Sequence, residues 1–213
     1  MNRWVFGYSF GPVEQKRQSP PLLRTKPLAI GDDHILSFQD IIQLLFIKLF
    51  RDEKISMPVI RAASDRAALK WQSDHPFAIR RLRHDGKTIF AELSLKDFED
   101  GRDPEVSRDR ILEDLQQGQI VISSIAKPYL FSKLDYNPDD VACWWPLGKE
   151  KRIVIDPRRN FGKPIDNKSG VSTYSLYAMV RGGEEPEKVA RWYEVDEQAV
   201  EDAIEFEHYL KAA

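Results

Sequence analysis

The strongest folding signal in this sequence is a run of turn-forming residues at positions 152–171, followed by three short helix-like segments. The stretch RIVIDPRRNFGKPIDNKSGVSTYSLYAMV, residues 152–180, contains two prolines and two glycines before it becomes periodically apolar. Proline fixes its backbone angle φ and glycine permits tight turns, so both residues interrupt regular elements. The pattern predicts a β-hairpin that leads into a helix with Ser172 or Thr173 as its N-cap.

Three helices are predicted after this hairpin. The first ends at Gly182-Gly183, the second begins at Pro186, and the third follows the capping residue Asp196. Apolar residues recur at helical spacing in each segment, which predicts a shared core. We expect a trihelical, helix-turn-helix-like bundle of about 40 residues, which needs support from the hairpin or from a second copy of the chain.

The preceding part of the chain mixes helices and strands. A hairpin is expected around Gly31, and N-cap chemistry predicts helices that begin after Ser37 and Ser56. A further helix is expected at Asp109–Gln117, among short β-like runs. The expected strands are Thr88–Leu93, Gln119–Ser123, Leu130–Tyr136, Val141–Trp145 and Ile153–Asp156. The sequence therefore predicts an α+β protein with three regions: residues 1–90, residues 91–150 as an α/β connecting or dimerisation region, and residues 151–213.

The residue patterns give little support for enzymatic chemistry. A phosphate-binding loop is excluded because Pro164 follows the Gly-Lys pair and removes an amide that should face phosphate. Cys143 is predicted to be structural, since it lies in an alternating strand with no histidine near it in sequence. Acidic residues cluster within residues 97–103 and 135–140, as carboxylates do in metal-dependent nucleases. The alternative is that both clusters are solvated charges on loops. We predict a non-enzymatic protein without metal or cofactor.

Charge is distributed unevenly along the chain, although the formal net charge is only −2. Residues 1–90 carry 15 Lys/Arg against 9 Asp/Glu, whereas residues 172–213 carry 4 against 10. The last predicted helix would bring its carboxylates close to phosphates if it entered a DNA groove, so we do not expect it to read DNA. A protein surface is the better partner for the aromatic residues of the bundle, although some of them can simply form its core.

Five ordered elements of the C-terminal region carry a family resemblance. They are Ile153–Pro157, Gly162–Pro164, Gly170–Thr173, Gly183–Tyr193 and Val200–Ile204. In this order they resemble the antitoxin domain known as domain-of-unknown-function family 433. The resemblance implies a VapB-type antitoxin of a type II toxin–antitoxin pair, which binds and neutralises a PIN-like ribonuclease toxin through this domain and represses its own operon through the N-terminal region.

The N-terminal region resembles the MerR-type winged helix that precedes this domain in longer family members. Trp4, Gly7 and Tyr8 match an element that follows the DNA-reading helix in those proteins, so the winged helix is expected to be truncated here. Five basic residues of this region are suited to contact DNA phosphates and not bases. The alternative is that they are ordinary solvent-exposed surface residues. They are Arg3, Lys16, Arg17, Arg24 and Lys26. We expect binding to operator DNA to be weak or lost.

The residues expected to bind the toxin are two arginines and five aromatic side chains. They are Arg158, Arg159, Phe161, Tyr174, Tyr177, Trp192 and Tyr193. The two arginines can reach a carboxylate-lined nuclease site as a fork, or they can form a salt-bridged turn. The alternatives to an antitoxin are a DNA-associated transcriptional regulator or structural adaptor without a toxin partner, and a metal-dependent nuclease.

The longest apolar run, residues 41–50, is about half a membrane span and contains Gln43 and Lys48. We therefore expect no membrane partner. A single cysteine cannot form an intramolecular disulfide and favours a reducing compartment. The expectation is a cytoplasmic protein that forms a homodimer.

Overall fold

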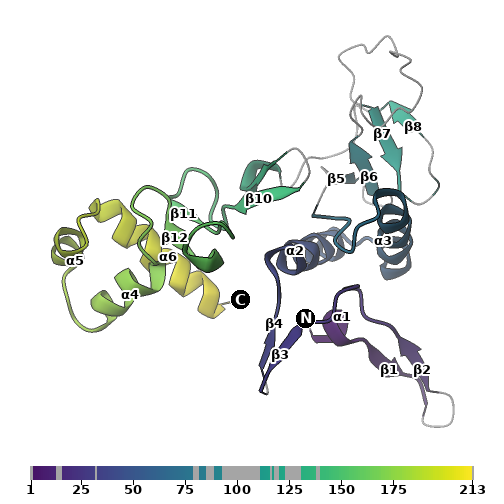
Figure 1. Ribbon diagram of the computed structural model, residues 1–213, viewed down its shortest axis with the longest axis horizontal. Coiled ribbons are helices and arrows are strands. Elements are labelled where there is room, and N and C mark those ends of the chain that lie inside the picture. The colour runs from purple at the N-terminus through teal and green to yellow at the C-terminus, as the bar shows by residue number, and fades with distance from the viewer. Residues whose placement is uncertain are drawn as a thin grey trace. The chain divides into compact units, whose positions relative to one another are not determined.

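The computed structural model describes residues 2–12, 16–31, 33–78, 82–84, 89–92, 111–115, 117, 120–122, 131–137 and 140–212. The chain divides into two compact units, Met1–Tyr129 and Leu130–Ala213. Helices and small antiparallel sheets occur together (Figure 1), so the predicted α+β class is confirmed. The division into three regions at residues 90 and 150 remains a prediction.

The first unit starts with a short helix and two hairpins. They are α1 (Asn2–Phe6), β1 (Tyr8–Phe10) paired with β2 (Arg17–Ser19), and β3 (Leu28–Ile30) paired with β4 (Asp33–Ile35). The hairpin expected around Gly31 is confirmed, and this glycine has the positive φ of 60° that the turn requires. The resemblance of this region to a winged helix remains a prediction.

Two long helices follow, and both predicted starts are confirmed: α2 (Phe38–Asp52) and α3 (Met57–Trp71). At α2 the Ser37 hydroxyl accepts the Asp40 N–H, and the Asp40 carboxylate accepts the Ser37 N–H, which forms a capping box. Ser56 occupies the N-cap of α3 without a side-chain hydrogen bond, and a proline lies in the first turn. Ile42, Ile47 and Ile60 are fully buried in the core of this unit.

A four-stranded antiparallel sheet completes the first unit, with its strands in chain order. They are β5 (Leu82–His84), β6 (Ile89–Glu92), β7 (Ile111–Asp114) and β8 (Ile120–Ile122). The prediction of a helix at Asp109–Gln117 is wrong, because Ile111–Asp114 pairs as a strand on both sides. A short apolar run fits either element, and pairing with distant neighbours overrides its weak helical pattern.

The second unit begins with two small hairpins. They are β9 (Leu134–Tyr136) paired with β10 (Val141–Trp144), and β11 (Ile153–Val154) paired with β12 (Ile165–Asp166). The backbones of Trp144 and Ile155 exchange hydrogen bonds and join the two hairpins. The 3-10 segment η3 (Phe131–Lys133) occupies the start of the strand expected at 130–136.

The three predicted C-terminal helices are present as α4 (Thr173–Arg181), α5 (Pro186–Trp192) and α6 (Glu197–Ala212). Helix α6 contacts both other helices and the β11–β12 hairpin, as Figure 1 shows. Ile153, Leu176 and Val189 meet Val200 and Phe206 in one buried cluster. The hairpin therefore supplies the extra core that a bundle of this size needs.

Candidate functional site

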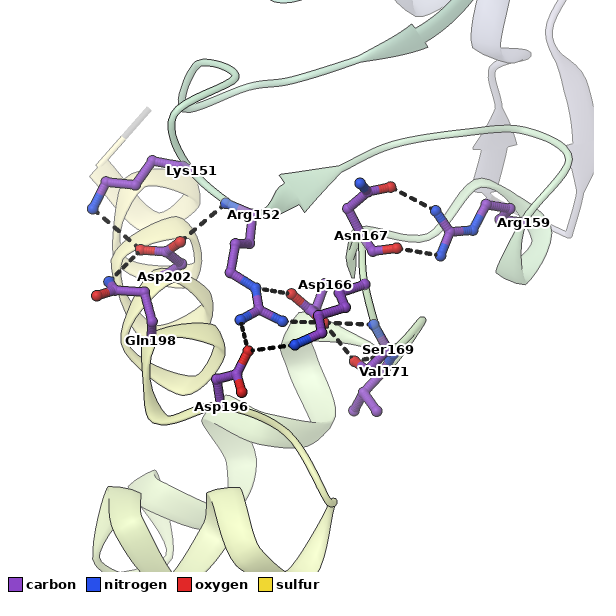
Figure 2. A network of polar contacts seen from close by, with 11 residues as sticks. Lys151, Arg152, Arg159, Asp166, Asn167, Ser169, Val171, Asp196, Gln198 and Asp202 are labelled. Carbon is purple, nitrogen blue, oxygen red and sulfur yellow. Dashed lines mark hydrogen bonds and ion pairs between the residues drawn. The ribbon is translucent and has the colours of Figure 1, made fainter.

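A buried carboxylate joins the β11–β12 hairpin to the loop before α4. Asp166 is 0% exposed and accepts hydrogen bonds from Arg152 at 2.6 and 3.1 Å (Figure 2). The backbone N–H and the hydroxyl of Ser169 also donate to Asp166, at 2.7 and 2.6 Å. Burial by itself raises the pKa of Asp166, but these hydrogen bonds outweigh it and hold the pKa below its ordinary value. Asp166 is therefore ionised at neutral pH and fixes the loop.

The same arginine ties the hairpin to the start of α6. Its guanidinium also donates to Asp196, and its backbone N–H donates to the buried carboxylate of Asp202 at 3.0 Å. Lys151 adds a 3.2 Å contact to Asp202 (Figure 2). We call Arg152, Asp166, Asp196 and Asp202 the polar latch. It sets the position of the hairpin against the helices, and so it positions the turn between the two strands.

That turn, residues 156–163, is held by hydrogen bonds from two arginines. The Arg158 guanidinium donates to Asp156 at 2.8 and 3.0 Å, and these bonds hold the pKa of Asp156 below its ordinary value despite partial burial. Arg159 donates to the side-chain and backbone oxygens of Asn167, both at 2.7 Å. Arg158 therefore forms a salt bridge within the turn, whereas Arg159 donates hydrogen bonds to uncharged oxygens.

The tip of the turn has an uncommon backbone. Asn160, Phe161 and Gly162 have φ values of 45°, 55° and 73°, so three consecutive residues lie in the left-handed region. Glycine adopts this region freely, but a large side chain does so at a cost of roughly 1–3 kcal/mol. The Phe161 side chain is nevertheless 97% exposed and gains no packing in return. We call residues 156–163 the Phe161 turn.

A groove lies beside the Phe161 turn, with a volume of about 560 Å³. It is bounded by the turn, the start of α4 and the end of α6. Its lining residues are Asn160, Lys163, Pro164, Ser172, Thr173, Tyr174, Ser175, Glu207 and Leu210. Two of the lining residues are joined by a hydrogen bond of 2.7 Å from the Thr173 hydroxyl to the Glu207 carboxylate.

The structure separates the seven expected toxin-binding residues into three groups. Tyr177 is buried beside His208 and Lys211, and Tyr193 packs against the helical core, so both have structural positions. The two arginines hold the Phe161 turn, as described above. The exposed side chains are Phe161, Tyr174 and Trp192, at 97%, 67% and 50%. Trp192 lies next to the Lys188 ammonium, 4.5 Å from its ring centroid.

Sequence reasoning missed the polar and apolar lining of the groove. Lys163 and Glu207 lie 44 positions apart in the sequence, and no local pattern marks them as lining the same groove. Leu210 follows Phe206 at helical spacing, which is typical of a core position, yet it is 51% exposed whereas Phe206 is 1% exposed. Only the packing of α6 on α4 decides which of the two is covered.

The five basic residues expected to contact DNA all lie in the first unit. Arg24 forms an ion pair with Asp65, so its charge is already partnered. The guanidinium of Arg3 lies 5.2 Å from the ring centroid of Tyr8. Lys16, Arg17 and Lys26 are exposed. The geometry therefore leaves four of the five side chains available to an anionic partner.

The remaining candidates for chemistry take structural positions or lie outside the described residues. Burial, together with Asp135, raises the pKa of the Cys143 thiol to about 11, so the thiolate is scarce at neutral pH, as expected of a structural cysteine. Asp135 itself binds Lys149 and the Trp145 indole N–H. The acidic group at 97–103 lies outside the described residues.

Among the described residues, no three His, Cys, Asp or Glu side chains are arranged to hold a metal ion. Within the same part of the chain, no helix has the length and apolar character needed to cross a bilayer.

Comparison with known proteins supports the resemblance seen in the sequence. Residues 153–206 match the family described as "Protein of unknown function (DUF433)". The chain is 27% identical to "Putative antitoxin VapB45" of Mycobacterium tuberculosis, over 95% of this chain and 84% of that protein. It is 26% identical to "Uncharacterized protein Rv2308" of the same organism, over 96% of this chain and 81% of that one. The crystal structure of RV2018 from that organism has a similar fold, with a TM-score of 0.56, 24% identity, and coverage of 86% of this chain and 85% of that one.

Proposed function

We propose that this protein is the antitoxin of a type II toxin–antitoxin pair and that its C-terminal unit binds the toxin. Similarity to a protein named as an antitoxin supports the proposal, since it extends over 95% of the chain. The structural observation that carries it is the exposure of three large aromatic side chains, Phe161, Tyr174 and Trp192, on a small domain with its own core. Exposed aromatic residues are enriched at the energetic centres of protein interfaces.

The partner is proposed to be a PIN-like ribonuclease, and the antitoxin itself is proposed to be non-enzymatic and cytoplasmic. Neutralisation then requires only that the toxin's active site be covered or distorted by a bound surface. A homodimer of this chain would present two such surfaces.

The test is co-expression with the product of the neighbouring gene. Alone, that product is expected to arrest growth of a bacterial host and to cleave RNA; with this chain, growth should resume and the two proteins should purify as one complex. A variant that lacks residues 153–213 should restore neither growth nor complex formation. A neighbouring product that is harmless but still bound would favour the structural adaptor, and one that is neither toxic nor bound would refute the antitoxin.

We further propose that the first unit binds the operator through phosphate contacts. Lys16, Arg17 and Lys26 are exposed, and Arg3 lies on the helix before the first hairpin. These are point charges on short elements, which position a protein on DNA without reading bases. Binding by them alone would be weak and nearly independent of sequence.

Affinity for a duplex from the upstream region should therefore depend steeply on salt. Up to four phosphate contacts predict a slope of about −3 to −4 in a plot of log K against log salt concentration. Replacing Arg3, Lys16, Arg17 and Lys26 by alanine should flatten the slope, whereas Arg24→Ala should leave it nearly unchanged, because Arg24 is paired with Asp65. Fluorescence anisotropy at several salt concentrations measures this. Tight, salt-insensitive binding would contradict phosphate positioning.

A further inference from the structure

We propose that Phe161 and the adjoining groove are the toxin-docking site, and that the matching site on the toxin is an apolar pocket bordered by carboxylates. This inference rests on the proposed antitoxin function and selects one surface of the C-terminal unit for it. The chemistry of the toxin surface is inferred from the side chains that the antitoxin exposes around Phe161.

Phe161 is held in a conformation that is unfavourable for the isolated domain. Its left-handed backbone is unfavourable for a large side chain, and its ring is almost fully in water. Neither property helps the isolated domain to fold, since glycine at this position would satisfy the turn without strain. The exposed ring contributes favourably only when another molecule removes its apolar surface from water.

Hydrogen bonds hold the Phe161 turn in this shape. Arg158 and Arg159 anchor it on Asp156 and Asn167, and backbone N–H groups of Gly162 and Lys163 donate to the carbonyls of Arg159 and Asn160 at 2.9 and 3.1 Å. The exposed ring is therefore presented by an ordered loop. A preorganised anchor loses little conformational entropy on binding, which is the property of a strong interface residue.

The Phe161 turn is more positively charged than the rest of the C-terminal unit. Residues 130–213 carry 12 Lys/Arg against 16 Asp/Glu, but the Phe161 turn contains three cations against one carboxylate, Asp156, which is paired with Arg158. Lys163, two residues after Phe161, is exposed and lines the groove, in which Glu207 is the one carboxylate among the described lining residues. An apolar ring with a cationic surround is complementary to an apolar pocket with an anionic rim.

The groove provides contact area beyond the ring itself. Tyr174 is 67% exposed and Leu210 is 51% exposed, and both line it together with Asn160 and Lys163. An inserted Phe161 would bring the toxin surface against these side chains at the same time. One anchor in a pocket, surrounded by partly exposed contacts, is the usual arrangement of a hot spot and its rim.

Trp192 is a less suitable anchor. Its ring already has the Lys188 ammonium 4.5 Å from its centroid, so part of its surface has a cation–π partner. It precedes the start of α6, whereas Leu210 lies near the end of that 16-residue helix. Trp192 does not line the groove beside the Phe161 turn, whereas Tyr174 and Leu210 do.

The test measures the affinity of full-length variants for the purified product of the neighbouring gene. Phe161→Ala is expected to weaken binding by about 30-fold or more, which is the loss typical of a hot-spot residue. Phe161→Gly should weaken binding equally while the domain becomes at least as resistant to unfolding, because the backbone strain is relieved. Leu69→Ala is the matched control, since it removes another exposed apolar side chain, 82% exposed, from α3.

Charge reversal at Lys163 tests the chemistry of the partner. Lys163→Glu should slow association, and the difference from the wild type should shrink as salt is added. An unchanged association rate would overturn the carboxylate rim, and Phe161→Ala with wild-type affinity would overturn the docking site. If the wild type itself fails to bind, the proposed antitoxin function is refuted instead, so the two failures are distinguishable. A larger loss for Trp192→Ala than for Phe161→Ala would place the docking site on α5 and also refute the inference.

Discussion

Replacing Asp166 by alanine should destabilise the C-terminal unit by about 3 kcal/mol, which is the loss typical of a broken buried ion pair. The substitution removes the acceptor of four hydrogen bonds and leaves the Arg152 guanidinium with only the exposed Asp196 as a partner. It also frees the Ser169 N–H inside the loop. Hydrogen exchange of the α4 and α6 amides measures the stability of this unit within the full chain.

The matched control is Lys168→Ala, which breaks the contact of 3.1 Å between two exposed side chains, Lys168 and Asp196. Exposed pairs contribute little, so the expected loss is below about 1 kcal/mol. Equal effects of Asp166→Ala and Lys168→Ala would contradict the importance of burial in the polar latch.

The difference between the wild type and Asp166→Ala should depend on pH. The pKa of Asp166 is lowered in the folded chain, so the ionised carboxylate stabilises the fold fully above its unfolded pKa of about 4. That stabilisation is lost as the pH falls through the lower folded pKa. The two proteins should therefore differ most at neutral pH and converge in acid. A difference that grows below about pH 4 would contradict this sign.

Replacing Phe206 by alanine is expected to destabilise the same unit by about 3–5 kcal/mol, the range for a fully buried phenylalanine. Phe206 is 1% exposed and lies in the cluster that joins α4, α5, α6 and the β11–β12 hairpin. The cavity would open where all four elements meet, and single domains are stable by only about 5–15 kcal/mol. The variant should therefore lose exchange protection in α4 and α6 and fail to neutralise the toxin at growth temperature.

Tyr209→Ala is the control for Phe206→Ala. Both residues lie in α6, but Tyr209 is 48% exposed, so its removal creates no cavity and should cost less than about 1 kcal/mol. Comparable losses for the two variants would contradict a dominant contribution from the buried core.

Local signals in the sequence predicted many of the elements correctly. The helix starts follow short-range signals: a serine precedes α2, α3 and α4, Pro186 is the first residue of α5, and Asp196 precedes α6. The β3–β4 hairpin follows from Gly31 in the same way. The Ile111–Asp114 strand could not be predicted, since its partners Phe90 and Ile122 lie outside any local window.

The candidate site was predicted only as a set of residue types. The sequence predicted seven aromatic and arginine residues as toxin contacts, and it treats Phe161, Tyr177 and Tyr193 alike. Packing distinguishes them: Tyr177 is 9% exposed beneath α6, while Phe161 is 97% exposed on its turn. The arginines, expected as a possible fork for the toxin, instead have intramolecular acceptors in Asp156 and Asn167.

The sequence by itself determined where this protein's helices begin, where its hairpins turn and which family the residues around 153–206 resemble, because each of these depends on short-range chemistry. Only the tertiary structure decided which apolar side chains are covered and which remain available to a partner. That outcome depends on how α6 packs against α4 and the hairpin, through residues such as Arg152 and Asp202 that lie 50 positions apart. Burial is a property of surfaces brought together from distant parts of the chain, and no local pattern specifies it.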